Sequence, residues 1–323
     1  MTNFSRNTRA RLTATLMAAI LFHLLAAGIA TAQSRFSGIV VFGTSLSDPG
    51  NAFALVGAQG TPPDFTLNPL LIPASPYAIG GHHFSNGATW IEQYARPAGL
   101  GESVKGALAT VDPAATNFAV GAARAYNDGV NFNLGRQVDT FLARSGGIAS
   151  PTALYVIEMG GNDVRDAFAV YAAGGNGGPI LAQGLAAIAA NIQRLYAAGA
   201  REFLVWTAPN IALTPAIGSL GPQARALAAQ LTQGFNAGLA QVLTQLRALP
   251  GVSLLTLDAY RLLGEIAAMP AAFGLANVTT ACLTPNVAPF QCQQADDYLF
   301  WDGIHPTKAG HAILAQEAAS IVR

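Results

Sequence analysis

The sequence predicts an α/β protein in which helices cover both faces of a mostly parallel sheet. Short apolar runs alternate along the chain with longer segments of helical periodicity, the order expected of successive strand and helix pairs. With 323 residues, of which 51% are hydrophobic and 11% charged, the chain can bury one large core. No internal repeat or linker indicates a further domain, so we expect residues 33–323 to form a single domain.

The expected strands are five apolar runs, each followed by a turn or a helical segment. They lie near residues 38, 117, 153, 202 and 252. Because the carboxyl ends of parallel strands meet at one edge of a sheet, the turns after these runs are expected to line a common crevice.

Helices are expected between these strands. The clearest has an apolar stripe at steps of four and three residues, which predicts one face packed on the sheet. This stripe consists of Leu181, Leu185, Ile188, Ile192 and Leu195. Other helices are predicted at 89–96, within 128–147 with Val138, Phe141 and Leu142 inward, at 222–248, and from near Pro306 to the end of the chain.

The first 32 residues have the pattern of a secretory signal peptide. A basic start with three arginines precedes an apolar centre at 16–29, and Ala30-Thr31-Ala32 is a small-residue cleavage site. A membrane anchor is the alternative, but the apolar part is shorter than the roughly 20 residues that span a bilayer, and His23 interrupts it. We expect export, to a periplasm or out of the cell, and no integral membrane segment in the mature chain.

Charge argues against a nucleic-acid partner. Lysine plus arginine and aspartate plus glutamate each number 17, and removal of the signal segment leaves a slightly acidic mature chain. No basic surface for nucleic acid is expected.

Ser45 stands in the turn that follows the first apolar run, residues 38–42. Serines are common in such turns, so this position alone does not identify a catalytic site. Near the other end of the chain, Asp302 and His305 are three residues apart, which lets a carboxylate orient an imidazole. The three residues form a candidate Ser-His-Asp triad. Asp258, at another strand end, is an alternative acid with no local spacing in its favour.

Asn162 follows the apolar run at 153–157 within a Gly-Gly-Asn-Asp segment. An asparagine at a strand end can donate its amide hydrogens to a developing oxyanion. It is therefore a candidate for stabilising a tetrahedral intermediate.

Several segments together resemble the GDSL family of lipases and acylhydrolases, also called SGNH hydrolases, particularly its secreted lipases and phospholipase-like haemolysins. The similar segments occur in family order and are residues 42–51, 84–90, 117–123, 160–163 and 302–306. The resemblance implies a three-layer α/β/α flavodoxin-like fold. It also implies Ser45 as nucleophile, His305 as general base and Asp302 as its orienting acid.

The same resemblance implies an oxyanion hole made of Asn162, the backbone amide of Ser45 and the Gly121-Ala122 turn. Two positions depart from the family pattern. Thr44 stands where the family has an acid, which removes a buried hydrogen-bonding partner from the loop. Ala122 stands where the family has a second glycine and is expected to be tolerated unless its φ must be positive.

A long segment rich in proline and glycine, residues 57–90, follows the serine turn and is expected to form one wall of the substrate cleft. His82 and His83 lie in it, but no acid or cysteine at a ligand-like offset favours a metal role. Three aromatic residues of this segment either line an acyl pocket or anchor the loop to the core; they are Phe65, Tyr77 and Phe84.

The two cysteines, Cys282 and Cys292, are expected to form a disulfide because export exposes them to an oxidising compartment. Two unpaired buried thiols are the alternative. A metal site is not expected, since further ligands at convincing spacing are missing from the sequence around them.

Together these features predict a secreted serine esterase or lipase that cleaves small-molecule or lipid esters through an acyl-enzyme, with no metal or organic cofactor. The chain lacks the Gly-x-Ser-x-Gly motif of the α/β-hydrolases. Two alternatives stay open: a polysaccharide O-acetylesterase, and an exported binding protein whose hydrolase site has decayed. The sequence does not predict the oligomeric state.

Overall fold

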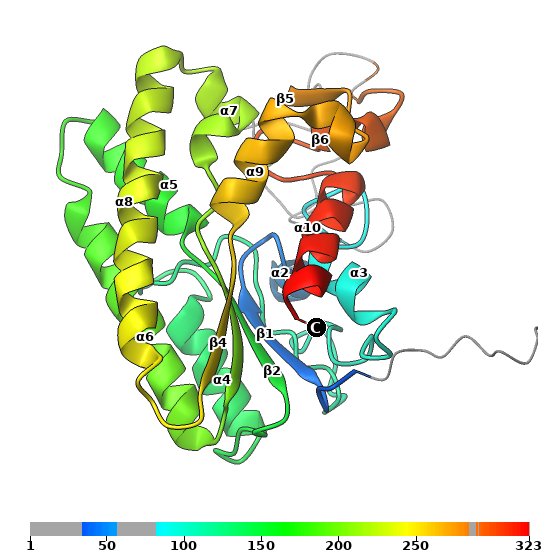
Figure 1. Cartoon of the computed structure of the whole chain (residues 1–323), viewed down its shortest axis with the longest axis vertical. Helices are drawn as coiled ribbons and strands as arrows, with labels where there is room; N and C mark the ends of the chain where they lie inside the picture. Colours follow the sequence, from blue (N-terminus) through cyan, green and yellow to red (C-terminus); the bar gives the residue numbers. More distant parts are fainter. Residues whose placement is uncertain (1–33, 57–81, 284–288, 290, 323) are drawn as a thin grey trace, which may run out of the picture. The chain divides into compact units, whose positions relative to one another are not determined.

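A parallel sheet lies at the centre of the computed structural model (Figure 1), which describes residues 34–56, 82–283, 289 and 291–322. Within this part of the chain the sheet has four strands in the order β1-β2-β3-β4. Their bounds are Ile39–Gly43, Leu154–Glu158, Glu202–Trp206 and Ser253–Leu257. All neighbouring pairs are parallel, as the alternation of apolar runs and helices predicts.

The fifth predicted strand, near residue 117, is reduced to a single parallel bridge between Asn117 and Val41 on the outer edge of β1. The segment does run along β1, because the Phe118 N–H donates to the Val41 carbonyl and the Val120 N–H to that of Gly43, but it does not form a full strand. Counted with this bridge, the spatial order is that of a flavodoxin-like sheet, in which the second segment lies outside the first.

Both faces of the sheet are covered. On β1, Ile39 and Val41 belong to one apolar cluster, whereas Val40 and Phe42 belong to the other. Because successive residues of a strand point to opposite faces, burial on both sides requires a continuous apolar run and not an alternating one. All five β1 residues are buried.

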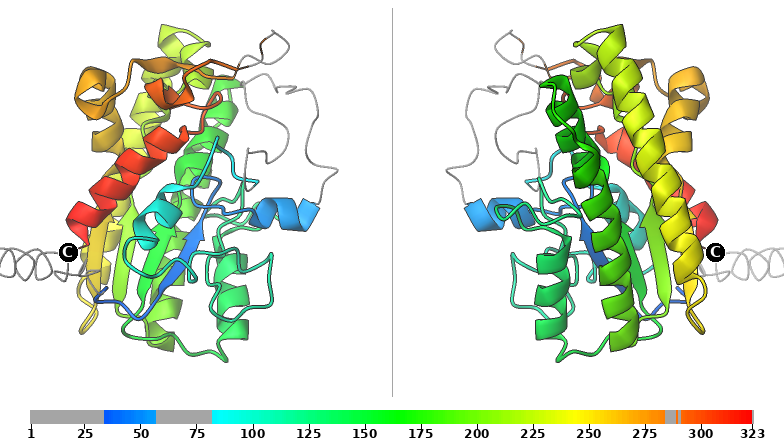
Figure 2. Two further views of the ribbon diagram at one scale, coloured as in Figure 1. Left: turned by 90° about the vertical axis from the view of Figure 1, so that its right-hand side faces the viewer. Right: turned by 90° about the vertical axis from the view of Figure 1, so that its left-hand side faces the viewer.

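One layer is formed by long helices that pack on Val40 and Phe42 (Figures 1 and 2). Its members are α4 (Leu134–Arg144), α5 (Gly161–Ala172), α6 (Gly178–Ala198) and α8 (Pro222–Leu246). The predicted stripe of α6 faces the core, with Ile188, Ile192 and Leu195 buried. Proline in the first turn starts both α6 and α8. Helix α5 was not predicted, because its first turn is the Gly-Gly-Asn-Asp segment that we interpreted as a strand end.

The other layer contains α3 (Trp90–Ala95) and α10 (Lys308–Ile321), which lie side by side in the left view of Figure 2. The final helix begins two residues after Pro306, because the Thr307 hydroxyl accepts a hydrogen bond from the Gly310 N–H and caps it. Helix α9 (Ala259–Ala268) was not predicted and begins at the end of β4, where the Asp258 side chain caps it.

A small two-stranded parallel sheet, β5 (Asn277–Ala281) and β6 (Tyr298–Phe300), lies above the carboxyl end of the main sheet (Figure 1). It was not predicted from the sequence. Short elements complete the fold: α2 (Asn51–Val56), η2 (Ile211–Leu213), α7 (Pro215–Gly218), η3 (Pro270–Phe273) and η4 (Ala295–Asp297).

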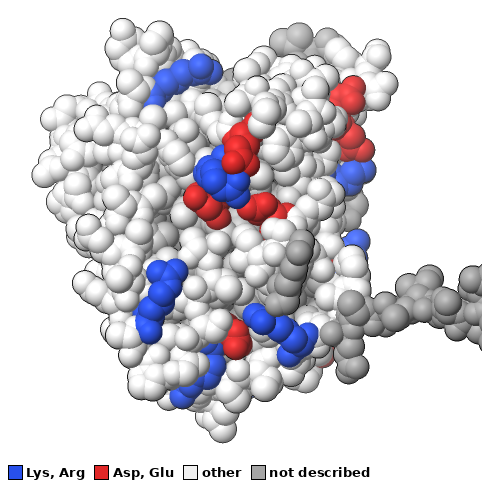
Figure 3. Space-filling view, viewed as in Figure 1, with Lys and Arg blue, Asp and Glu red and all other residues white. Residues whose placement is uncertain are grey.

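The expected signal peptide and most of the expected cleft wall, including Phe65 and Tyr77, lie outside the described residues. Residues 35–323 cluster into one compact unit. None of the helices described is long and apolar enough to cross a membrane. The face in Figure 3 is mostly uncharged, with basic and acidic residues scattered over it.

Candidate functional site

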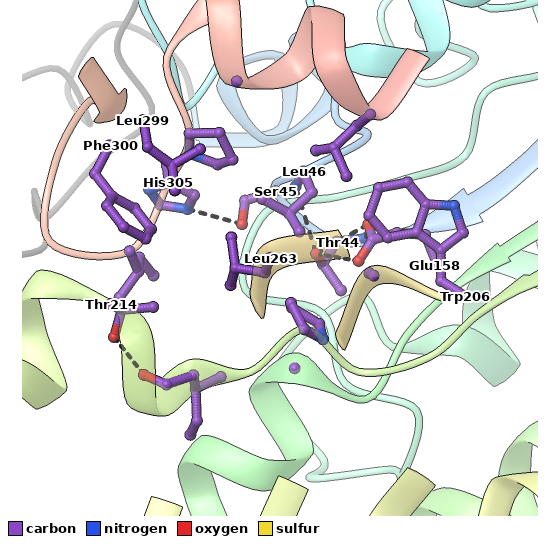
Figure 4. Close-up of a pocket in the computed structure, with 18 of the residues that line it drawn as sticks. Thr44, Ser45, Leu46, Glu158, Trp206, Thr214, Leu263, Leu299, Phe300 and His305 are labelled. Carbon is purple, nitrogen blue, oxygen red and sulfur yellow. Dashed lines mark hydrogen bonds between the residues drawn. The ribbon is translucent and has the colours of Figure 1, made fainter. Parts of the chain in front are cut away.

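Ser45, His305 and Asp302 form a continuous chain of hydrogen bonds at the carboxyl end of β1. Figure 4 shows the bond between Ser45 and His305. The Ser45 Oγ lies 2.8 Å from His305 Nε2, and the opposite ring nitrogen, Nδ1, lies 2.6 Å from Asp302 Oδ2. All three side chains are buried. This geometry suits an imidazole that receives the serine proton on one nitrogen while a carboxylate fixes the other.

The loop that carries Asp302 and His305 is closed by hydrogen bonds within itself, and the Ala216 N–H also donates to the Gly303 carbonyl at 2.9 Å. Asp302 Oδ1 accepts the backbone N–H groups of Ile304 and His305, at 2.8 and 2.7 Å. The Trp301 N–H closes the loop on the His305 carbonyl at 2.8 Å. One carboxylate oxygen therefore shapes the turn while the other orients the imidazole, which is why a spacing of three residues was informative.

The Cys282–Cys292 disulfide lies next to this loop. Cys282 packs with Trp301 in one buried cluster, and the Leu283 N–H donates to the Trp301 carbonyl at 2.8 Å. The disulfide thus lies against Trp301, the residue that precedes Asp302.

The loop that carries Ser45 is supported from another strand. Glu158, the last residue of β2, accepts the Thr44 N–H at 2.8 Å and the Thr44 hydroxyl at 3.0 Å (Figure 4). It also accepts the Ser47 hydroxyl at 3.2 Å. Burial raises the pKa of Glu158 to about 7, and these hydrogen bonds oppose the rise. A carboxyl group is thus present beside Thr44, although β2 supplies it and not the serine loop. We did not single out Glu158 from the sequence; an acid ending a buried apolar run was the available signal.

Asp48 joins the serine loop to the Gly121 turn. Its Oδ1 accepts the N–H groups of Gly50 and Asn51, and its Oδ2 accepts those of Ala52 and Gly121. Burial raises the pKa of Asp48 to about 6, against the lowering effect of these bonds. Part of the similarity in residues 42–51 and 117–123 is therefore explained by contacts between the two segments.

Asn162 lies in the first turn of α5. Its Nδ2 donates to the Ala123 carbonyl at 2.8 Å, and its Oδ1 accepts from Arg165 at 3.1 Å. A carboxamide nitrogen has two hydrogens, so one N–H is left for a ligand. Asn162 lines the same cavity as Ser45 and His305.

The Gly121-Ala122 turn differs from the expectation in two respects, the partner of the Gly121 N–H and the φ of Ala122. The Gly121 N–H donates to Asp48 at 2.7 Å, and Ala122 has a φ of 64°, in the left-handed region. The backbone here requires a positive φ, which favours glycine over alanine, so Ala122 is strained at this position. A Cβ on Gly121 would lie 2.3 Å from the ring of Phe84, whose centroid is 5.1 Å from that of His305. Phe84 therefore fills the space between the turn and the imidazole.

A cavity that is open to solvent begins at Ser45 and His305 and extends beneath α9 and α10. Its wall is mainly apolar, which suits an acyl chain. The apolar residues are Leu46, Trp206, Pro209, Ile211, Ala259, Leu262, Leu263, Ile266, Leu299, Phe300, Ile304, Pro306 and Leu314.

Other candidates from the sequence have different surroundings. Asp258 accepts the Arg261 N–H at 3.0 Å and the Thr207 hydroxyl at 3.1 Å, and so caps α9. His82 stacks on Phe53, and His83 Nε2 lies 2.8 Å from Glu92 Oε2. Within the described ranges, His, Cys, Asp and Glu form no group of three or more that could hold a metal ion.

Comparison with known proteins identifies similar chains. The family profile described as GDSL-like Lipase/Acylhydrolase matches residues 39–318. Esterase EstA of Pseudomonas aeruginosa is 30% identical over 360 residues, covering 95% of this chain and 50% of that protein. A GDSL esterase/lipase of Arabidopsis thaliana is 26% identical over 344 residues, covering 90% and 86%. The chain thus spans about half the length of the Pseudomonas relative.

Among solved structures, an extracellular lipase from Streptomyces rimosus is 18% identical, with a TM-score of 0.42. The alignment covers 88% of this chain and 99% of that one.

Proposed function

Because the chain belongs to the GDSL-like lipase/acylhydrolase family, we propose that it is a serine ester hydrolase that cleaves acyl esters through an acyl-enzyme. The observation that carries the proposal is the hydrogen-bonded chain from Ser45 through His305 to Asp302, opening on an apolar cavity. Nucleophile and base lie within hydrogen-bond reach, and a third group orients the base.

In the proposed reaction, Ser45 Oγ attacks the ester carbonyl while His305 Nε2 takes its proton. Asp302 holds Nδ1–H and stabilises the imidazolium that forms. The imidazolium then gives the proton to the leaving alkoxide, which departs as the alcohol and leaves the acyl group on Ser45. A water molecule, deprotonated by His305, cleaves this acyl-enzyme, and the proton returns to Ser45.

The oxyanion of each tetrahedral intermediate requires donors beside Ser45. We assign the free N–H of Asn162 and the backbone N–H of Ser45, with the Gly121-Ala122 turn as the expected third contributor. Among the described residues the Ala122 N–H has no acceptor, whereas the Gly121 N–H donates to Asp48. Ala122 is therefore the better donor of the two.

The proposed substrates are small-molecule or lipid esters whose acyl chain enters the apolar cavity. We also propose that the protein is exported. The Cys282–Cys292 disulfide supports an oxidising compartment, and the signal-like sequence of residues 1–32 supports the route.

The test is hydrolysis of p-nitrophenyl esters from acetyl to palmitoyl by the wild-type chain and Ser45→Ala. Ser320→Ala, an exposed serine on α10, is the matched control. We expect Ser45→Ala to lower kcat by roughly a thousand-fold or more and Ser320→Ala to leave it unchanged. Equal activity of Ser45→Ala and wild type would overturn the serine mechanism. Hydrolysis confined to acetylated polysaccharides would favour the O-acetylesterase, and no hydrolysis of any ester would favour the binding protein.

A further inference from the structure

Arg165 is a positively charged side chain in the wall of an otherwise mainly apolar cavity. It lies on α5, one helical turn after Asn162, and shares the cavity with Ser45 and His305. Burial lowers the pKa of Arg165, but a guanidinium stays charged at neutral pH. The proposed catalytic groups thus have a permanent cation beside them.

The neighbouring carboxylates do not neutralise Arg165 by direct contact. Asp166, the next residue, binds Arg124 through two hydrogen bonds of 2.8 and 3.0 Å and also accepts the Tyr126 hydroxyl. Asp302 is directed at His305. Over the described part of the chain, Arg165 makes no ion pair, and its hydrogen bond goes to the neutral Asn162 amide.

A half-buried guanidinium without a directly bound carboxylate has donors that the anion of a ligand can satisfy. Arginine offers five N–H donors in a planar fork, and its bond to Asn162 uses one of them. The other donors match the paired oxygens of a carboxylate or a phosphate.

The position of Arg165 relates this anion to the reacting bond. Arg165 donates to Asn162 Oδ1, while the opposite end of the same amide carries the N–H assigned to the oxyanion. An anionic group close to the scissile ester can therefore contact Arg165 while the ester carbonyl contacts Asn162.

We propose that Arg165 is a specificity-determining residue, and that the preferred substrates are esters bearing a carboxylate or phosphate near the scissile bond. This inference rests on the proposed ester hydrolysis and adds the charge of the substrate to it. The acyl chain occupies the apolar part of the cavity and the anion contacts the guanidinium.

A purely positioning role for Arg165 is the competing explanation. The Arg165 donor and the Ala123 acceptor together fix which end of the Asn162 amide faces the cavity. If Arg165 did nothing else, its loss would affect neutral and anionic esters equally and would lower kcat more than it raised KM.

The first experiment measures binding and does not require turnover. Hexyl phosphate, hexanoate and 1-hexanol are titrated by calorimetry into Ser45→Ala, alone and combined with Arg165→Gln or with Arg136→Gln. Arg136 is the matched control, because it is an exposed arginine near the start of α4 and away from this cavity.

We expect Arg165→Gln to raise the Kd of at least one anion roughly 10- to 100-fold and to leave that of 1-hexanol unchanged. The two anions distinguish a carboxylate site from a phosphate site. Arg136→Gln is expected to change none of the three. Equal binding of all three probes, or equal loss for anions and alcohol, overturns the proposal.

The second experiment compares kcat and KM for a neutral butyryl ester and for butyryl esters with a carboxylate or phosphate on the alcohol. We expect Arg165→Gln to raise KM for a charged ester selectively, and Arg165→Lys to restore part of the difference. In wild type the preference for the charged ester should fall with added salt. A charge preference that survives Arg165→Gln overturns the assignment. Failure to cleave any ester would refute the proposed ester hydrolysis. The calorimetric titrations would still show whether Arg165 binds an anion.

Discussion

The loop that carries Ser45 and the loop that carries Asp302 and His305 reach the same point of the cavity by different means. The turn from Trp301 to His305 is closed by bonds between residues at most four apart in the sequence. Longer-range bonds from Leu283 and Ala216 then fix its outer carbonyls. The Ser45 loop depends on Glu158, which is 114 residues from Thr44, and on Gly121, which is 73 residues from Asp48. A local motif can thus be predicted from spacing, whereas a motif built on distant partners cannot.

The largest expected effect comes from Asp302→Asn, which keeps the shape of the local loop and changes only the group that faces the imidazole. The Asn carbonyl can still accept the N–H groups of Ile304 and His305, but its NH₂ would donate toward His305 Nδ1 and force the proton onto Nε2. The imidazole could then no longer accept the Ser45 proton. We expect kcat to fall by roughly ten-thousand-fold with an unchanged circular dichroism spectrum.

Asp258→Asn is the control for this change, because Asp258 caps α9 and was the other candidate acid. It should alter stability more than kcat. A larger loss of kcat in Asp258→Asn than in Asp302→Asn would reverse the assignment of the acid.

Asn162→Ala tests a residue that belongs to neither loop but lines the same cavity as Ser45 and His305. We expect kcat to fall roughly 100- to 1000-fold with little change in KM, since the donor is needed when charge develops on the carbonyl oxygen. Asn191→Ala is a suitable comparison, because Asn191 is a buried asparagine on α6 whose Nδ2 donates to the Ala187 carbonyl. An unchanged kcat in Asn162→Ala would remove this residue from the oxyanion hole.

Glu158→Gln probes the long-range support of the Ser45 loop through pH. The pKa of Glu158 is raised from 4.5 to about 7, so the folded protein binds a proton more tightly than the unfolded chain does. The stability linked to this proton is complete below pH 4.5 and is lost as the pH rises toward 7. We expect the free energy of unfolding of wild type to fall by about 1–3 kcal/mol more than that of Glu158→Gln over this range.

The measurement is urea unfolding of both proteins at pH 4.5 and pH 8. Asp48 has a pKa raised to about 6 and contributes a loss of the same sign, but it is common to both proteins and cancels in the comparison. Identical pH profiles would mean that Glu158 does not titrate in this range.

The smallest expected effect, that of Ala122→Gly, lies in the Gly121-Ala122 turn, which Asp48 joins to the Ser45 loop. Ala122→Gly relieves a left-handed alanine, worth about 1–2 kcal/mol, but gives the unfolded chain about 0.4–1 kcal/mol of added entropy. The free energy of unfolding should rise by up to about 1 kcal/mol. Gly121→Ala places a Cβ against Phe84 and should lower it by about 1–3 kcal/mol. A destabilised Ala122→Gly in thermal unfolding would contradict this reasoning.

Most of the fold was accessible from the sequence because burial on both faces makes β1, β2 and β3 read as continuous apolar runs. The α6 stripe was accessible for a similar reason, since one helix face packs on the sheet. Helix α5 was not predicted because its first turn is polar and contains Asn162, which lines the cavity. Helix α9 was not predicted because it starts immediately after Asp258, without an intervening loop.

The sequence by itself determined the order of the four strands of the main sheet and of several of the helices around them, the residues of the candidate triad and the Asn162 candidate. Each of these depends on periodicity, on spacing within one turn or on position at the end of a strand. Only the tertiary structure decided that Glu158 supplies the carboxyl group beside Thr44, that Ala122 has a positive φ and that Arg165 has no carboxylate partner over the described part of the chain. Each of these properties depends on residues that are far apart in the sequence and become neighbours only when the sheet is assembled. Periodicity and spacing along the chain do not indicate which distant residues will meet.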